Sequence, residues 1–148
     1  AVETQSAFEA RFGVPIIETM GLTETAAQIL SNPLPPAQRK IGSPGIAFGC
    51  DVEIHDRDGT RLPPHAEGEI VVRGPHNMKE YWNRPDATAE TIIDGWLHTG
   101  DIVSRDKDGF LYFVDRRKDM IKTGGENVST REVEEAGGYA PAPIAATM

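Results

Sequence analysis

The sequence predicts a strand-rich α+β fold, and three observations lead to that expectation. Short apolar or alternating segments recur at intervals of roughly 10 to 20 residues through the middle of the chain. Tight turns rich in Asp and Gly, such as Asp56-Arg-Asp-Gly59, separate several of these segments. Only short stretches predict helices. Such spacing is more typical of a small barrel or sandwich than of a βαβ array.

The first part of the chain predicts a helix, a strand and a long loop. Residues 6–11 favour the helix, and the apolar residues 14–17 favour a brief strand that leads to a turn at Gly21. Residues 31–45 contain four prolines and two glycines, so we expect a loop there.

The middle of the chain predicts hairpins and one helix. Alternating residues favour strands, Asp and Gly favour the turns between them, and Pro85 suits the first turn of a helix. The expected elements are strands at 51–56 and 68–74, a helix from Pro85 to about Ile92, and a hairpin of 102–104 with 110–114. Ser129-Thr-Arg-Glu132 predicts a capping box that opens a further helix, and residues 137–148 predict a frayed tail.

Composition excludes several functions. The 148 residues are enough for one ordinary domain, and 15 basic against 23 acidic residues give a net charge of −8. This acidity argues against binding to nucleic acid or to a membrane surface, and no apolar run is long enough to cross a membrane. The single cysteine, Cys50, fits the reducing cytoplasm. Because the chain opens at Ala1 within a predicted helix, we expect a piece of a longer protein.

Two segments carry the chemistry of a nucleotide site. Gly95-Trp-Leu-His-Thr-Gly-Asp101 places a carboxylate after a Thr-Gly turn between two expected strands, where it suits the two hydroxyls of a ribose. Residues 115–129 combine a cationic cluster, including Arg116, with the pair Gly124-Gly125, which permits close approach of a ligand or a swinging loop. The alternatives are a turn-capping aspartate and a solvated strand end.

A third segment, Gly21-Leu-Thr-Glu24, places a hydroxyl beside a carboxylate on a tight turn. Thr23 could contact a phosphate oxygen there, and Glu24 could bind Mg²⁺. The alternative is a loop threonine beside a solvated glutamate.

In this order, the motifs resemble those of the adenylate-forming superfamily of acyl-CoA synthetases, luciferases and peptide-synthetase adenylation domains. Thr23-Glu24, the strand Gly68–Gly74, the Thr99-Gly-Asp101 turn and the segment from Asp115 to Ser129 carry the resemblance, which spans roughly residues 8 to 136. The sequence Lys122-Thr-Gly-Gly-Glu-Asn-Val-Ser129 is of the acyl-CoA synthetase kind.

The resemblance implies an enzyme that uses Mg·ATP to convert a carboxylate into an acyl-adenylate and then into a thioester of coenzyme A. It implies that Thr23 contacts phosphate, that Glu24 binds Mg²⁺ and that Asp101 binds the ribose. The other implied contacts are Met20 and Gly21 at the adenine, Arg116 at ribose or phosphate, Lys118 as the hinge, Lys122 and Asn127 at the adenylate, and Gly124 and Gly125 along the pantetheine path.

The resemblance also implies a division of the chain. Residues 1–30 would end the sheet of the large domain, 31–117 would form a small distorted β-barrel, 118–136 would form the hinge and the start of an α/β lid, and 137–148 an irregular tail. Two expected features are absent from the sequence: the Gly-rich phosphate loop and the lysine at the end of the lid. We therefore expect the isolated chain to be inactive.

The substrate cues conflict. Met20, Leu22 and Ala26 slightly favour an apolar acyl chain, whereas residues 31–43 are similar to the loop of oxalate–CoA ligases and the lid motif is closer to carnitine-type and longer-chain ligases. Two other functions stay open: an enzyme that loads the phosphopantetheine of a carrier protein, and a non-catalytic fragment.

Overall fold

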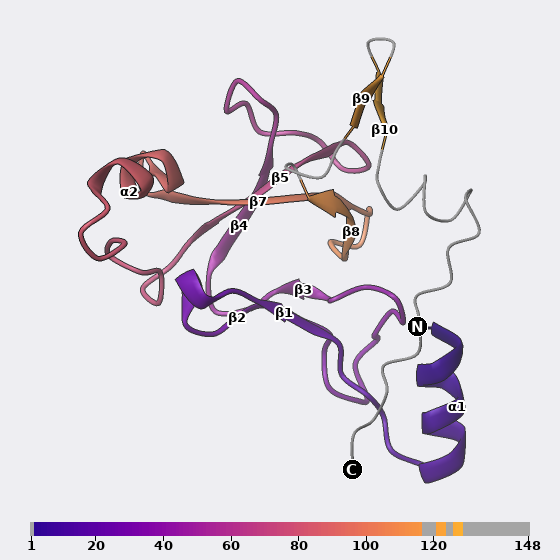
Figure 1. The fold of residues 1–148 in the computed structure, drawn as a ribbon. Coiled ribbons are helices and arrows are strands. Elements are labelled where there is room, and N and C mark those ends of the chain that lie inside the picture. The colour runs from indigo at the N-terminus through magenta and orange to yellow at the C-terminus, as the bar shows by residue number, and fades with distance from the viewer. Residues whose placement is uncertain (1, 117–120, 124–125, 129–148) are drawn as a thin grey trace, which may run out of the picture.

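The computed structural model describes residues 2–116, 121–123 and 126–128 (Figure 1). Helix α1 (Val2–Phe12) comes first, and strands β1 (Thr19–Gly21), β2 (Gln28–Ser31) and β3 (Ile46–Ala47) then form an antiparallel sheet in that order. A 3₁₀ helix, η1 (Thr23–Thr25), joins β1 to β2. This small sheet therefore carries the Thr-Glu motif on the turn at its edge strand.

The larger sheet is antiparallel and centres on the long strand β7 (Trp96–Arg105). On one side β7 pairs with β5 (Glu67–Arg73), which pairs with β4 (Asp51–His55). On its other side β6 (Ile92–Ile93) and β8 (Leu111–Arg116) pair with opposite halves of β7. Helix α2 (Pro85–Thr91) leads into β6, and a separate hairpin joins β9 (Ile121–Thr123) to β10 (Glu126–Val128).

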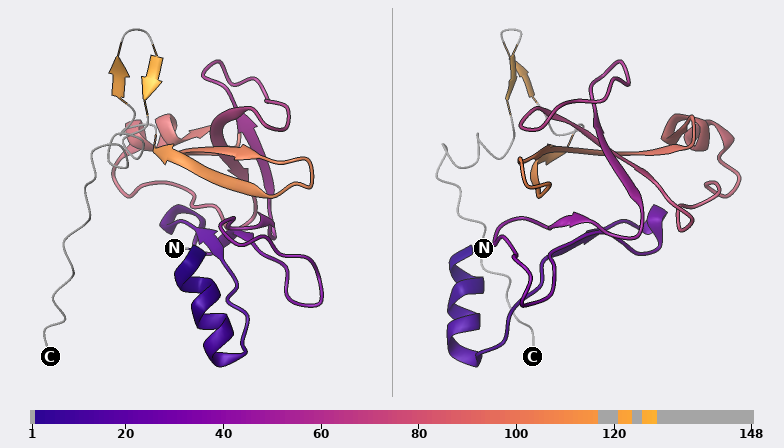
Figure 2. Two further views of the ribbon diagram at one scale, coloured as in Figure 1. Left: turned by 90° about the vertical axis from the view of Figure 1, so that its right-hand side faces the viewer. Right: turned by 180° about the vertical axis from the view of Figure 1, so that it is seen from behind.

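One apolar core joins the two sheets. Figure 2 shows the small sheet and α1 together on one side of the curled larger sheet. The buried core residues come from both sheets, and each is at most 2 % exposed: Ile29, Leu30, Ile54, Ile70, Val72, Val103 and Leu111. Burial of these side chains gives the described part of the chain its main apolar stabilisation.

The loop before β3 lies against the backbone of β2 and is hydrogen-bonded to β8 of the larger sheet. Gly45 has φ +104°, and a Cβ atom there would lie 2.0 Å from the carbonyl carbon of Ser31. The Leu111 N–H donates to the Gly45 carbonyl at 3.0 Å, and the Ser43 hydroxyl donates to the Leu111 carbonyl at 2.5 Å. Glycine is needed here because any side chain would push this loop away from β2.

Most of the predicted elements are confirmed. The fold is strand-rich, the expected strands correspond to β4 and β5, Pro85 stands at the first helical position of α2, and β7 and β8 form the expected hairpin. None of the helices in the described ranges is long and apolar enough to cross a bilayer. The helix and tail predicted after Ser129 lie outside the described residues.

Two predictions about strands are wrong. Residues 14–17 form no strand, because side chains rather than a neighbouring strand bind the backbone there: the Ile16 N–H donates to Glu9 Oε1 at 2.7 Å, and the Ile16 carbonyl accepts from Arg39 Nη1 at 3.1 Å. The Thr99-Gly-Asp101 segment does not separate two strands. It lies within the continuous β7, where Gly100 adopts φ +77° at a register irregularity opposite β5.

Candidate functional site

A cavity of about 450 Å³ opens between the edge of the small sheet and the β7–β8 pair. Met20 and Gly21 of β1 line one side of it, and Asp101, Phe113 and Arg116 line the other. Four of the residues singled out in the sequence therefore share one cavity, although about 80 residues separate the two sides along the chain.

Register explains why the charged residues of this cavity face each other. Asp101 on β7 is the cross-strand partner of Arg116 on β8, and Arg116 Nε lies 3.3 Å from Asp101 Oδ1. The Asp101 side chain is 6 % exposed, whereas that of Arg116 is 69 % exposed. The carboxylate is thus fixed at the base of the cavity, and the guanidinium can move toward a ligand.

Burial makes the negative charge of the Asp101 carboxylate energetically unfavourable. Burial raises the pKa of the carboxyl group, the Arg116 guanidinium acts in the opposite direction, and the nearby charge of Glu69 adds to the rise. A buried carboxylate paired with an exposed arginine stabilises the fold little, because exposed ion pairs contribute about 0–1 kcal/mol.

The turn before Asp101 is fixed by hydrogen bonds to β5. The Thr99 hydroxyl donates to the Ile70 carbonyl at 2.9 Å, and the Gly100 N–H donates to Glu69 Oε1 at 2.8 Å. Glu69 Oε2 also lies 3.0 Å from His98 Nδ1, and only 8 % of the Glu69 side chain is exposed. These contacts set the direction in which β7 presents Asp101.

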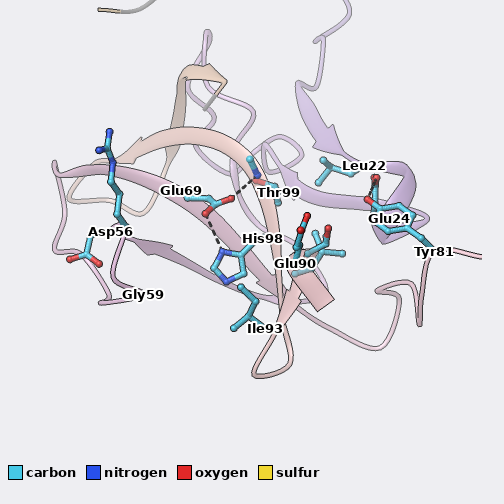
Figure 3. A pocket seen from close by; sticks show the side chains of 14 residues that line it. Leu22, Glu24, Asp56, Gly59, Glu69, Tyr81, Glu90, Ile93, His98 and Thr99 are labelled. Atoms are coloured by element: carbon cyan, nitrogen blue, oxygen red, sulfur yellow. Dashed lines mark hydrogen bonds and ion pairs between the residues drawn. The ribbon is translucent and has the colours of Figure 1, made fainter. Parts of the chain in front are cut away.

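Glu24 lies in a second cavity of about 520 Å³ (Figure 3). Leu22 lines both this cavity and the one that holds Asp101, so it stands between them. Figure 3 shows Glu69, His98 and Thr99 on the strand side of this second cavity and Glu24 with Tyr81 on the other. Thr23 is exposed on η1 beside Glu24. Glu24, which is predicted to bind the metal, therefore lies in a cavity adjacent to the one that holds Asp101 and Arg116, which are predicted to bind the ribose.

The donor set suits Mg²⁺ only together with a ligand. In the described ranges no three His, Cys, Asp or Glu side chains come together to hold a metal ion. Mg²⁺ often binds one or two carboxylates and completes its shell with water and the phosphates of a substrate. Glu24, half-buried at the cavity wall, fits that mode of binding.

Five other predicted residues lie on the segment after β8. Lys118, Gly124 and Gly125 lie outside the described residues. Lys122 and Asn127 are cross-strand partners on β9 and β10. The structure thus adds a register for this pair, and the roles of all five residues stay predictions.

Three residues of the site were missed from the sequence. Phe113 lines the first cavity, Glu69 binds the turn before Asp101, and Tyr81 binds Glu24. Glu69 stands within the quoted strand Gly68–Gly74, but strand alternation alone does not reveal that its carboxylate accepts a backbone N–H from β7. Tyr81 is 57 positions from Glu24, so no local pattern could relate them.

The chain is a β-rich segment with two adjacent cavities, and comparison with known proteins identifies its family. Residues 1–82 match the family of AMP-binding enzymes. Since this match covers more than half of the chain, the chain belongs to the AMP-binding enzyme family.

Curated relatives are CoA ligases. The chain is 50 % identical over 135 residues to sulfoacetate–CoA ligase of Cupriavidus necator, covering 90 % of this chain and 26 % of that protein. It is 49 % identical over 124 residues to 2-succinylbenzoate–CoA ligase of Bacillus cereus, covering 83 % of this chain and 26 % of the relative. The chain therefore spans about a quarter of the length of these relatives.

Solved structures agree with this relationship. O-succinylbenzoate coenzyme A synthetase of Bacillus subtilis, in complex with ATP and magnesium ion, superposes with a TM-score of 0.75 at 42 % identity, covering 86 % of this chain and 27 % of the other. An anthranilate CoA ligase in complex with anthranoyl-AMP gives a TM-score of 0.79 at 31 % identity, covering 90 % and 26 %.

Proposed function

We propose that this chain is part of an ATP-dependent acyl-CoA synthetase, an AMP-forming acid–thiol ligase. The observation that carries the proposal is the cavity in which buried Asp101 faces Arg116 beside Met20 and Gly21. A carboxylate and a guanidinium so placed suit a ribose and its phosphate. The relatives named as CoA ligases, and the one in complex with ATP and magnesium ion, support the choice of nucleotide and reaction.

The described residues divide the binding of Mg·ATP among them. Asp101 accepts hydrogen bonds from the two ribose hydroxyls, and Arg116 contacts ribose or phosphate oxygens. Met20 packs on the adenine beside the Gly21 backbone. In the neighbouring cavity Glu24 would hold Mg²⁺, with Thr23 at a phosphate oxygen. A metal ion held there would supply positive charge that stabilises the diphosphate as it leaves.

The reaction proceeds in two halves. A carboxylate oxygen of the substrate attacks the α-phosphorus of ATP, and diphosphate leaves. The sulfur of coenzyme A then attacks the acyl carbon of the adenylate, and AMP leaves. Lys122 and Asn127 would face the adenylate, Gly124 and Gly125 would line the pantetheine path, and rotation about Lys118 would bring the second arrangement into place.

The acceptor distinguishes this proposal from its nearest alternative, an enzyme that loads the phosphopantetheine of a carrier protein. The names of the relatives favour coenzyme A. The substrate is a small carboxylic acid, and a cytoplasmic enzyme fits the single cysteine and the ATP requirement. An acidic net charge of −8 disfavours nucleic acid as a partner.

The experiment uses the full-length protein that carries this sequence and a panel of carboxylic acids. Exchange of diphosphate into ATP that depends on one of these acids tests the first half-reaction. Product analysis with free coenzyme A and, in parallel, a phosphopantetheinylated carrier protein tests the second. An acid-dependent exchange followed by an acyl-CoA product supports the proposal. A thioester on the carrier protein alone would favour the alternative, and a lack of exchange with every acid would favour a non-catalytic protein.

A further inference from the structure

The loop between β5 and α2 contacts Glu24 at two points. The Met78 N–H donates to the Glu24 carbonyl at 2.6 Å, and the Tyr81 hydroxyl donates to Glu24 Oε1 at 2.7 Å. Figure 3 shows the Tyr81 ring beside Glu24 at the wall of the second cavity. One contact fixes the backbone of Glu24 and the other fixes its carboxylate.

Tyr81 is itself fixed by the first turn of α2. Its N–H donates to the Thr88 hydroxyl oxygen at 2.9 Å, and its carbonyl accepts from the Arg84 N–H at 3.0 Å. The Thr88 hydroxyl in turn donates to the Arg84 carbonyl at 2.9 Å. These bonds fix the backbone from which the Tyr81 side chain extends, so less conformational freedom remains to be lost when its hydroxyl orients Glu24.

The direction of the hydrogen bond is also set. An ionised carboxylate can only accept, so the Tyr81 hydroxyl is the donor of the 2.7 Å hydrogen bond to Glu24 Oε1. Tyr81 holds Oε1 of Glu24, so a cation that enters this cavity would bind through Oε2.

We propose that Tyr81 is a positioning residue for the magnesium ligand Glu24, which deepens the proposed function and rests on it. Mg²⁺ requires near-ideal octahedral geometry, so a carboxylate ligand must keep one orientation while the metal and the phosphates bind. Hydrogen bonds from outer-shell partners supply that orientation, and their loss commonly costs about 10- to 100-fold in metal affinity or activity.

A purely structural role for Tyr81 makes a different prediction. In that case the hydroxyl only anchors the β5–α2 loop, and its removal would lower stability without a specific effect on the metal. The carboxylates of Glu69 and Glu90 line the same cavity, so general electrostatic attraction of a cation there would survive the loss of a neutral hydroxyl. The two roles can therefore be separated by measuring binding with and without metal.

The test measures ATP binding to the full-length protein by calorimetry, with Mg²⁺ and with a chelator, for wild type and Tyr81→Phe. Mn²⁺ binding in the presence of ATP, followed by electron paramagnetic resonance, gives a second readout that needs no turnover. We expect Tyr81→Phe to weaken metal binding about 10- to 100-fold and to leave metal-free ATP binding within about twofold. The matched control is Tyr112→Phe, which removes a hydroxyl contact to Asp106 at 3.3 Å outside both cavities.

A double-mutant cycle with Glu24→Gln makes the result specific. If Tyr81 acts through Glu24, Tyr81→Phe should have no further effect on metal binding once Glu24 is replaced. Equal losses of ATP affinity with and without metal, or an unchanged metal affinity, would overturn the inference, as would additive effects in the cycle. A wild-type protein whose ATP binding does not respond to Mg²⁺ would instead contradict the proposed function.

Discussion

Replacing Asp101 by asparagine should separate nucleotide binding from stability. The substitution keeps the size and shape of the side chain but removes the negative charge at the base of the first cavity. In the proposed complex the carboxylate accepts two hydrogen bonds from ribose hydroxyls. Hydrogen bonds to a charged group contribute about 1.5–3 kcal/mol each and neutral ones roughly half as much. The expected loss of binding energy is therefore about 2 kcal/mol, or roughly 30-fold in Kd.

The effect on folding should be small. The Arg116 partner is 69 % exposed, so this ion pair contributes about 0–1 kcal/mol. Burial raises the pKa of Asp101, which means that the fold favours the protonated form and is less stable once the pH rises above the pKa of the folded state. Asparagine removes this disadvantage at neutral pH, so Asp101→Asn should unfold at a temperature close to that of wild type or slightly higher.

The assay compares AMP and ATP binding by calorimetry with thermal unfolding of the same full-length preparations. Asp106→Asn is the matched control, since it removes an aspartate charge that lies outside both cavities. An unchanged nucleotide Kd, within about twofold, would mean that Asp101 only shapes its turn. A loss of affinity that appears together with a large fall in melting temperature would refute the separation of binding from stability.

Three further predictions concern stability, pH and the hinge. Thr25→Val should lower the free energy of unfolding by about 1–3 kcal/mol in chemical denaturation. The fully buried Thr25 hydroxyl accepts from the Leu22 N–H at 3.1 Å, and loss of the hydroxyl leaves this N–H unpaired. A change below about 0.5 kcal/mol would contradict this reasoning. Burial alone would raise the pKa of Asp106, but the Lys40 ammonium and backbone N–H groups outweigh burial and lower the pKa to about 2. The stability that Asp106 contributes should therefore be present above about pH 4 and vanish as the pH falls toward 2. Asp106→Asn should flatten the pH dependence of the melting temperature in that window, and an unaltered slope would be inconsistent with this pairing. Lys118→Pro should fix φ near −65° and impair thioester formation far more than adenylation in single-turnover assays, whereas parallel losses would argue against a hinge.

Local patterns allowed much of the larger sheet to be predicted. The alternation in residues 51–56, the Asp/Gly turns and Pro85 each act over a few residues, so their elements follow from neighbours in sequence. The small sheet was harder. Strand β2 has only four residues, and its burial depends on contacts with the larger sheet rather than on its own pattern. Residues 14–17 look apolar, yet Glu9 and Arg39 bind their backbone and prevent strand pairing.

In the candidate site, too, the residues within local motifs could be predicted, whereas those whose roles depend on distant contacts could not. Asp101 and Arg116 could be chosen from the sequence because each stands in a motif with its own chemical logic. That they face each other depends on the register of β7 and β8, which the sequence alone does not fix. Glu69 and Tyr81 were not predicted because their roles arise from hydrogen bonds to Gly100 and Glu24 across 31 and 57 positions.

A crystal structure of the full-length protein with AMP tests directly where the nucleotide binds. We expect both ribose hydroxyls to lie within about 3.2 Å of the Asp101 carboxylate oxygens, with Arg116 turned toward ribose or phosphate and the adenine beside Met20. A nucleotide bound elsewhere, with Asp101 still paired only to Arg116, would contradict the assignment of this cavity as the nucleotide site.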